Sequence, residues 1–319
     1  MGSGNWSTNV YDAAARFRAA SGTGAFAYSD RVTASAPRST WAAHPSLDPK
    51  DIGIRESRDS AEHPTSLAIA VLFDVTGSMR AVPQVLQTKL PELFGLILRK
   101  GYTEHPQILF GAVGDATCDR VPLQLGQFES DNRMDDDLGN ILLEGGGGGQ
   151  MTESYELALY AMARHTSIDC HEKRGRRGYL FLIGDEMPYG RVKAHEVRRV
   201  LGDELAEDIP ISRIVAELKR TFDIYYILPA GASYVGNPEV LGFWRKVLGQ
   251  NVIELDDLDA VCETIALTVG LGEEAIDLAE GLDDLDDIGS AAGASVGKAL
   301  AALGGRDRGE VVVTNMRLL

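Results

Sequence analysis

Cysteine is scarce in this sequence. Only three cysteines occur among its 319 residues, at Cys118, Cys170 and Cys262. They are odd in number and widely spaced, which favours neither a disulfide framework nor a CxxC metal site. His171 follows Cys170 directly, but two adjacent residues alone rarely form a zinc site. We therefore expect reduced thiols and a cytoplasmic protein.

Basic residues and long apolar runs are also scarce. The chain has 31 Lys and Arg against 47 Asp and Glu, which gives a formal net charge of −16. Because nucleic-acid binders usually carry a basic face, we expect no nucleic-acid partner. No stretch of the sequence approaches the roughly 18 consecutive apolar residues of a transmembrane helix. The N-terminus has no basic-then-apolar signal pattern, so we expect no membrane association.

Five short and nearly continuous apolar runs are present instead. They lie at residues 67–73, 108–113, 179–184, 224–228 and 251–255. Strands buried on both faces of a parallel sheet have this composition. Segments with helical spacing, such as residues 82–100, separate the runs. The order predicts an α/β fold, a Rossmann-like open and mostly parallel sheet with helices on both faces. Residues 120–128 alternate in polarity and predict an antiparallel edge strand.

Composition divides the chain into three parts. Residues 1–65 are rich in small and polar residues and predict an extended N-terminal arm, with one short helix at 10–22. Residues 66–270 contain all five apolar runs and form the predicted α/β domain. Residues 271–319 begin with a strongly acidic stretch and predict a helical and flexible tail.

Both terminal parts contain candidate contact residues. In the arm, Tyr28 and Trp41 are expected to hold the chain against the domain surface. In the tail, residues 310–316 read EVVVTNM and could pair with a sheet edge or with another chain. An acidic helix exposed to solvent is the simpler interpretation of the tail.

Polar residues gather after the predicted strands. Ligands of open α/β sheets bind where the carboxyl ends of the strands meet, so we expect these residues at one rim. They are Asp74, Thr76, Ser78, Asp115, Asp119, Thr152, Asp185 and Glu186. All carry oxygen atoms, and four separate segments contribute them. The sequence therefore predicts an oxygen-rich site.

Such a site suits magnesium. Mg²⁺ prefers octahedral oxygen coordination and keeps several waters, so two or three protein ligands are enough. Thr76 and Ser78 offer hydroxyls from one turn, and Thr152 can reach the ion from a neighbouring loop. Asp74 and Asp185 can hold metal-bound waters, and such outer carboxylates orient the direct ligands. Mg²⁺ is the predicted cofactor, with Mn²⁺ or Ca²⁺ as alternatives.

The segment DVTGSM at residues 74–79 resembles the DxSxS motif of von Willebrand factor A (vWA) domains, with Thr in the first hydroxyl position. That family's metal-ion-dependent adhesion site (MIDAS) adds a threonine after a glycine-rich loop and an aspartate after a strand. Thr152 and Asp185 match these positions, and the resemblance covers roughly residues 66–270. It implies a non-catalytic protein whose metal ion is completed by a Glu or Asp of a protein partner.

The resemblance has departures as well as a biological implication. Gln150 and Met151 separate the glycines from Thr152, so Glu153 could reach the metal instead, and Glu186 could add negative charge to the site. Intracellular proteins that resemble this family often act as adaptors in multi-component bacterial systems, for example with AAA+ ATPases. We expect that context here.

Three other interpretations stay open. The hydroxyls of Thr76, Ser78 and Thr152 could simply cap helices. DVTGS also resembles the DKTGT of P-type ATPases, haloacid-dehalogenase-like phosphotransferases in which the aspartate, here Asp74, accepts a phosphoryl group. The lysine of that family has no counterpart at a strand end between Thr152 and Asp185. Finally, the chain could be a structural subunit that forms an oligomer or larger assembly through its arm and tail.

Overall fold

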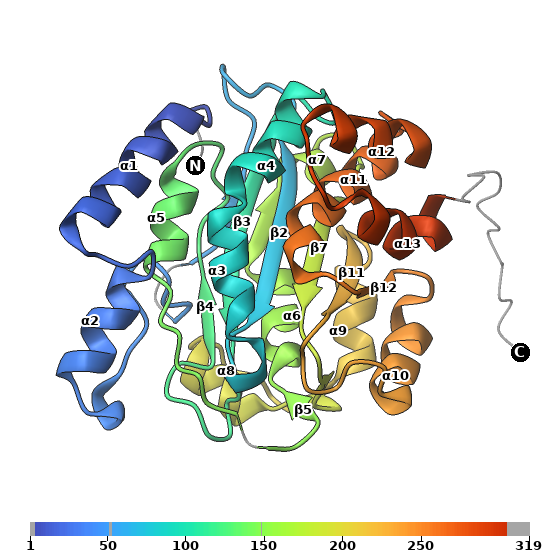
Figure 1. The fold of residues 1–319 in the computed structure, drawn as a ribbon. Coiled ribbons are helices and arrows are strands. Elements are labelled where there is room, and N and C mark those ends of the chain that lie inside the picture. Colours follow the sequence, from blue (N-terminus) through green and yellow to red (C-terminus); the bar gives the residue numbers. More distant parts are fainter. Residues whose placement is uncertain (1–3, 51–52, 148, 305–319) are drawn as a thin grey trace, which may run out of the picture.

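The computed structural model describes residues 4–50, 53–147 and 149–304. A six-stranded sheet forms its centre, with the strand order β12-β11-β7-β2-β3-β4 (Figure 1). These strands are β2 (Leu67–Asp74), β3 (Pro106–Val113), β4 (Leu123–Leu125), β7 (Gly178–Ile183), β11 (Phe222–Pro229) and β12 (Val252–Leu255). All neighbouring strands are parallel except β3 and β4, which are antiparallel.

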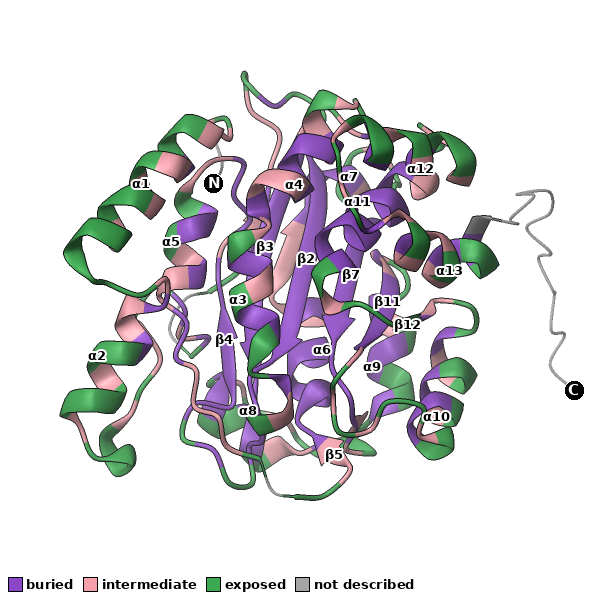
Figure 2. Ribbon diagram, in the orientation of Figure 1, coloured by how far each residue is buried: buried purple, intermediate pink, exposed green. Residues whose placement is uncertain are grey.

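The predicted α/β architecture is confirmed at this level. Each of the five apolar runs forms a parallel strand, and the antiparallel edge strand β4 lies within residues 120–128. The sheet is buried between helices, as Figure 2 shows, and every residue of β2, β3 and β7 is buried. Continuous apolar sequence is therefore a consequence of burial on both faces.

Helices cover the two faces of the sheet. On one face lie α3 (Ala81–Thr88), α4 (Leu90–Phe94), α5 (Arg133–Gly139) and α11 (Val261–Gly272). On the other lie α6 (Tyr155–Arg164), α7 (Asp169–Glu172), α9 (Ile211–Leu218) and α10 (Pro238–Leu248). The helix α8 (Ala194–Val200) and the 3-10 turns η2 (Gly77–Met79) and η4 (Leu258–Ala260) lie in the connections.

Three small sheets accompany the central one. The strand β1 (Arg55–Ser57) pairs in parallel with β6 (Thr166–Ile168). The strand β5 (Thr152–Glu153) pairs in parallel with β8 (Met187–Pro188). The strands β9 (Arg191–Val192) and β10 (Ile209–Pro210) are antiparallel.

The helical segment expected at residues 82–100 is interrupted. It consists of α3, α4 and a π-helical turn, Gly95–Arg99. Pro91 has no N–H to donate to the carbonyl of Gln87 four residues earlier, which breaks the ladder of helical hydrogen bonds. The hydroxyl of Tyr11 donates to that carbonyl instead, at 2.8 Å. A residue of the N-terminal segment thus supplies the hydrogen bond that the Gln87 carbonyl lacks within the helix.

The N-terminal segment differs from the expected extended arm. It contains α1 (Thr8–Ser21), α2 (Ala27–Ser35) and the 3-10 turn η1 (Arg38–Thr40), and α1 and α2 lie beside α5 (Figure 1). The Trp6 ring stacks on Phe94 with centroids 4.6 Å apart. Aromatic and hydrogen-bonding side chains of the segment contact the domain, and the segment therefore folds as helices on the domain surface and not as an extended chain.

The hydrogen bonds of the two residues expected to fasten the arm are local. The hydroxyl of Tyr28 donates to the carbonyl of Ala42, and the Trp41 indole donates to the carbonyl of Ala36. Trp41 also lines a pocket together with residues 119–123 of the domain. Other residues of the segment form direct bonds to the domain, as Arg58 does by pairing with Asp169 at 2.8 Å.

The C-terminal segment also packs on the domain. The boundary expected at residue 270 falls inside α11, and α12 (Leu278–Asp287) and α13 (Gly293–Gly304) follow. Leu285, Val296 and Leu300 are fully buried, because these helices contact α11 and, through α13, β12. Residues 310–316 lie outside the described residues.

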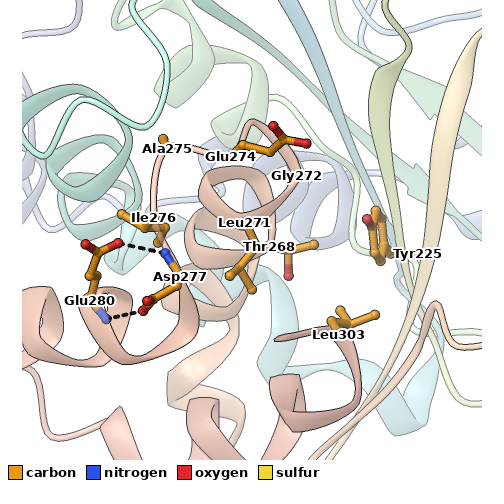
Figure 3. Close-up of a pocket in the computed structure, with 10 residues that line it drawn as sticks. All are labelled: Tyr225, Thr268, Leu271, Gly272, Glu274, Ala275, Ile276, Asp277, Glu280 and Leu303. Atoms are coloured by element: carbon orange, nitrogen blue, oxygen red, sulfur yellow. Dashed lines mark hydrogen bonds between the residues drawn. The ribbon is translucent and has the colours of Figure 1, made fainter. Parts of the chain in front are cut away.

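A cavity of about 420 Å³ lies between α11 and the helices that follow it (Figure 3). At its edge, Asp277 and Glu280 bond each other's backbone N–H groups and cap α12. None of the predicted metal ligands lines this cavity. Within the described part of the chain, no helix has both the length and the apolar character needed to cross a membrane.

Candidate metal site

Asp74 ends β2 and is completely buried. Its Oδ1 accepts a hydrogen bond from the backbone N–H of Thr76 at 2.6 Å, and its Oδ2 accepts one from the hydroxyl of Tyr155 at 2.7 Å. Thr76, two residues later, is nearly as deeply buried, with 4% exposed. Asp74 therefore organises the turn that carries the two predicted hydroxyl ligands.

Ser78 and Asp185 meet directly at the carboxyl end of the sheet. Ser78 lies in η2 after β2, and Asp185 lies two residues after β7, the strand next to β2. The Ser78 hydroxyl donates to Asp185 Oδ1 at 3.2 Å. The backbone N–H groups of Ser233 and Tyr234, in the loop after β11, donate to Asp185 Oδ2 at 2.8 and 3.4 Å. Three strand-end segments thus meet at one carboxylate.

Thr152 lies in β5, which pairs it with Met187 of β8, two residues after Asp185. Figure 1 places β5 at the end of the molecule toward which β2 points. Among the described residues, no direct hydrogen bond joins Thr152 to Asp74, Thr76, Ser78 or Asp185. The structure therefore brings Thr152 to the same rim, where it shares no hydrogen bond with the other four residues.

The helix-cap interpretation of the three hydroxyls is wrong. The N-cap of α6 is Ser154, not Thr152, and the N-cap of α3 is Arg80. Thr76 precedes η2 but makes no side-chain capping bond. Because the chain is extended at Thr152 and α3 begins only at Ala81, none of these hydroxyls caps an α-helix.

The glycine-rich loop packs against the Asp74–Ser78 turn. The N–H of Gly77 donates to the carbonyl of Gly146 at 3.0 Å, and the N–H of Gly145 donates to the carbonyl of Val75 at 3.2 Å. Gly145 and Gly147 have φ values of 64° and 121°, which favour glycine. The glycines therefore allow close backbone contact beside the site, where a phosphate cradle would require open N–H groups.

Further carboxylates surround the turn. Asp115, Glu153 and Glu186 are 0%, 1% and 8% exposed. Glu153 Oε1 and Glu186 Oε2 are buried and have no hydrogen-bond partner. In the described ranges, no lysine or arginine forms an ion pair with Asp74, Asp185 or these three acids. The site therefore gathers several buried carboxyl groups that no basic residue of the described chain pairs with.

The pKa values of these groups reflect this environment. Burial raises the pKa of Asp74, and the nearby Asp185 raises it further against the hydrogen bonds from Thr76 and Tyr155. Burial raises the pKa of Glu186 to about 8, with Asp74 and Asp185 adding to the rise. Burial followed by repulsion from Asp74 and Glu186 raises the pKa of Glu153 strongly. A cation at the site would oppose all of these shifts.

Two tyrosines belong to the site, although the sequence analysis did not identify them. Tyr155 is the buried donor to Asp74, yet in the sequence it is one apolar position of α6 among several. The Tyr189 hydroxyl donates to Asp115 Oδ2 at 3.1 Å, accepts from Gln150 and also bonds the Thr152 side chain. No periodicity marks Tyr189, which lies in a connection.

Asp119, which was expected at the rim, forms structural contacts there. Its Oδ2 accepts from the N–H of Asp115 at 2.8 Å, and its Oδ1 pairs with Arg38 of the N-terminal segment at 2.9 Å. The same arginine pairs with Glu144, directly before the glycines. Asp119 therefore connects η1 to the loops around the site.

The available donors suit an oxygen-seeking ion with few direct protein ligands. Across the described residues, no three His, Cys, Asp or Glu side chains converge as a metal site. Any ion here would depend on the hydroxyls of Thr76, Ser78 and Thr152, with carboxylates behind them. Mg²⁺, which keeps several waters, fits this donor set, whereas Zn²⁺ prefers nitrogen and sulfur.

Comparison with protein-family models and with curated protein sequences finds no match. Among solved structures, the pilus adhesin SpaC from Lactobacillus rhamnosus GG, in its open conformation, is 11% identical with a TM-score of 0.45. That alignment covers 65% of this chain and 30% of the adhesin. Proximal thread matrix protein 1 from the mussel byssus is 10% identical with a TM-score of 0.41, over 68% of this chain and 49% of that one. The chain spans under half of either protein, and this similarity assigns no family or ligand.

Proposed function

We propose that this chain contains a vWA-type domain that binds a protein partner through a divalent cation, Mg²⁺. The hydroxyls of Thr76, Ser78 and Thr152 would hold the ion, and Asp74 and Asp185 would hold its waters. The observation that carries the proposal is the hydrogen bond from Ser78 to Asp185. It joins two segments that match the MIDAS pattern separately, beside buried carboxyl groups that pair with no Lys or Arg of the described ranges.

The chemistry of such a site favours an anionic partner group. When bound, the ion would offer an open coordination position with strong Lewis acidity, because neutral hydroxyls withdraw little of its charge. A Glu or Asp carboxylate of the partner would complete its coordination. Asp74 and Asp185, fixed by hydrogen bonds, would keep the hydroxyl turn in place. Mn²⁺ or Ca²⁺ could replace Mg²⁺ at an oxygen site of this kind.

A binding role is favoured over phosphoryl transfer by the surroundings of Asp74. Both of its carboxylate oxygens accept hydrogen bonds, and the side chain is completely buried. A nucleophile must instead present a free oxygen to its substrate. In addition, no lysine bonds Asp74 or Asp185 within the part of the chain that the structure describes. We therefore propose a protein without catalytic activity of its own.

The proposed setting is an intracellular, cytoplasmic adaptor in a multi-component bacterial system, for example beside an AAA+ ATPase. The net charge of −16 disfavours nucleic acid as the partner. Both terminal segments contribute helices that pack on the domain. This packing favours the segments as parts of the folded domain over the alternative in which they mainly assemble an oligomer.

Metal-dependent capture tests the proposal. Immobilised protein is incubated with lysate in Mg²⁺ or in chelator, and bound proteins are identified by mass spectrometry. We expect partners captured only with Mg²⁺, and their loss in Asp74→Ala and Ser78→Ala. Ser21→Ala, at an exposed serine in α1, is the matched control. Mg²⁺ should also raise the Tm of the control and not of Ser78→Ala. Equal capture in chelator would contradict the proposal.

A further inference from the structure

A small cavity lies directly beside Ser78. Its volume is about 80 Å³, several times the roughly 10–15 Å³ that one water molecule requires. Met79, at the end of η2, and Ala81 and Val82, at the start of α3, line one part of it. Pro229, the last residue of β11, and residues 230–232 after it line another, and Leu258 of η4 completes the wall.

The side chains that line it are apolar apart from one hydroxyl. Ser78 is its only polar side chain among the described residues, and the other members are Met, Ala, Val, Pro, Gly and Leu. No charged side chain lines the cavity, although the neighbouring metal site is crowded with carboxylates. An uncharged, apolar group would therefore gain from entering it, since apolar surface leaves water without breaking a hydrogen bond.

The cavity and the candidate metal site share structural elements. Ser78 belongs to both, as a lining residue and as a predicted metal ligand. The loop after β11 lines the cavity at residues 230–232, and the N–H of the next residue, Ser233, donates to Asp185. Gly231 has a φ of 82°, so the loop makes a turn there that favours glycine. A ligand atom at the metal would thus lie next to the cavity.

We infer that the partner presents a carboxylate together with a small aliphatic side chain, and that the aliphatic group occupies the cavity beside Ser78. The inference rests on the proposed function, because the metal-bound carboxylate places the partner. The cavity then selects among acidic partners. It admits a group of a few carbon atoms, and among the described residues Ser78 contributes the one polar side chain that lines it.

Small carboxylates with tails of increasing length are direct probes. Acetate, propanoate, butanoate and 3-methylbutanoate share the metal-binding group and differ only in the apolar part. Their affinities for the Mg²⁺-loaded protein are measured by titration, with methyl NMR signals of Ala81, Ala230 and Ala232 as the local readout. We expect the affinity to rise roughly four-fold for each methylene that enters the cavity. The alanine methyl signals should shift with the longer tails and not with acetate.

A variant that fills the cavity is the decisive test. Ala81 is exposed at the start of α3, and Ala81→Leu places a larger apolar group at the cavity wall. We expect this variant to bind acetate in Mg²⁺ as before but to lose the gain from longer tails. Ala13→Leu, on the exposed face of α1, is the matched control and should keep that gain.

The outcomes separate this inference from the proposed function. If acetate binding does not depend on Mg²⁺, the proposed function fails. If acetate binds through Mg²⁺ but tail length has no effect, or if Ala81→Leu keeps the full gain, the cavity is not the subsite and only this inference is overturned. Longer tails that bind better in the control and not in Ala81→Leu support both.

Discussion

The Tyr155 hydroxyl donates a 2.7 Å hydrogen bond to Asp74 Oδ2, and both residues are completely buried. Tyr155 begins α6 and Asp74 ends β2, so this bond connects a helix covering the sheet to the turn that carries Ser78. A buried carboxylate oxygen needs such a donor, because an unsatisfied one is costly. The orientation of the candidate site thus depends on the helix layer.

Tyr155→Phe tests this connection. Removal of the hydroxyl leaves Asp74 Oδ2 without its donor, and we expect the free energy of unfolding to fall by about 1–3 kcal/mol. Mg²⁺ affinity should fall about 10- to 100-fold, as for other partners of metal-site residues. Urea unfolding and calorimetric titration measure the two effects. Tyr160→Phe is the control. Tyr160 lies on the same helix as Tyr155, and its hydroxyl donates a 2.7 Å hydrogen bond to Asp203, which the variant loses. Equal loss of Mg²⁺ affinity in both variants would contradict a specific role for Tyr155.

Glu153→Gln tests whether this acid is a direct ligand. Burial and the surrounding carboxylates raise the pKa of Glu153, so the side chain is neutral at pH 7 without metal, and the neutral amide has nearly the same shape. We expect a change in unfolding free energy within about 0.5 kcal/mol and less than a ten-fold change in Mg²⁺ affinity. Thr152→Ala should weaken Mg²⁺ binding more strongly. The reverse order in titration calorimetry would identify Glu153 as the ligand in place of Thr152.

Asp59→Asn tests the attachment of the N-terminal segment through its pH dependence. Although burial acts the other way, hydrogen bonds from Arg174 and Ser66 hold the pKa of Asp59 well below its ordinary value. A depressed folded pKa stabilises the protein above the unfolded pKa of about 3.9, and this contribution is lost as the pH falls below that value. We expect Asp59→Asn to cost about 2 kcal/mol at pH 7, measured by urea unfolding.

The difference between the wild-type protein and Asp59→Asn should shrink between pH 5 and pH 3. Asp283→Asn, at an exposed position of α12, should differ little from the wild type at either pH. A constant difference for Asp59→Asn across this range would show that its carboxylate charge does not contribute to stability.

Trp6→Ala tests whether the N-terminal segment belongs to the folded domain. The Trp6 ring stacks on Phe94, which is buried in α4. Since Trp6 is only partly buried, we expect a loss of about 2 kcal/mol, below the value for a core aromatic residue. Phe17→Ala is the control, because Phe17 is 74% exposed on α1 and should change stability by less than about 0.5 kcal/mol. Equal stability of both variants in thermal unfolding would indicate a segment that does not support the domain.

Much of the fold was predictable from local patterns. The runs at 67–73 and 179–184 form parallel strands, as predicted, because continuous apolar sequence suits strands covered on both faces. The structure shows in addition that these two strands are neighbours. Asp74 and Asp185 were placed at one rim for the same reason, since parallel strands end on the same side. The break before Pro91 was not predicted, because the apolar spacing continues through it.

The sequence by itself determined the strands of the central sheet, their burial and the set of oxygen-bearing residues at its carboxyl end, because each depends on residues close together in the chain. Only the tertiary structure decided which of them touch. Tyr155 bonds Asp74 across 81 positions, Ser78 bonds Asp185 across 107, and Thr152 enters a strand rather than a helix cap. Such contacts depend on how helices and loops pack on the sheet, and the spacing of residues along the chain does not predict that packing.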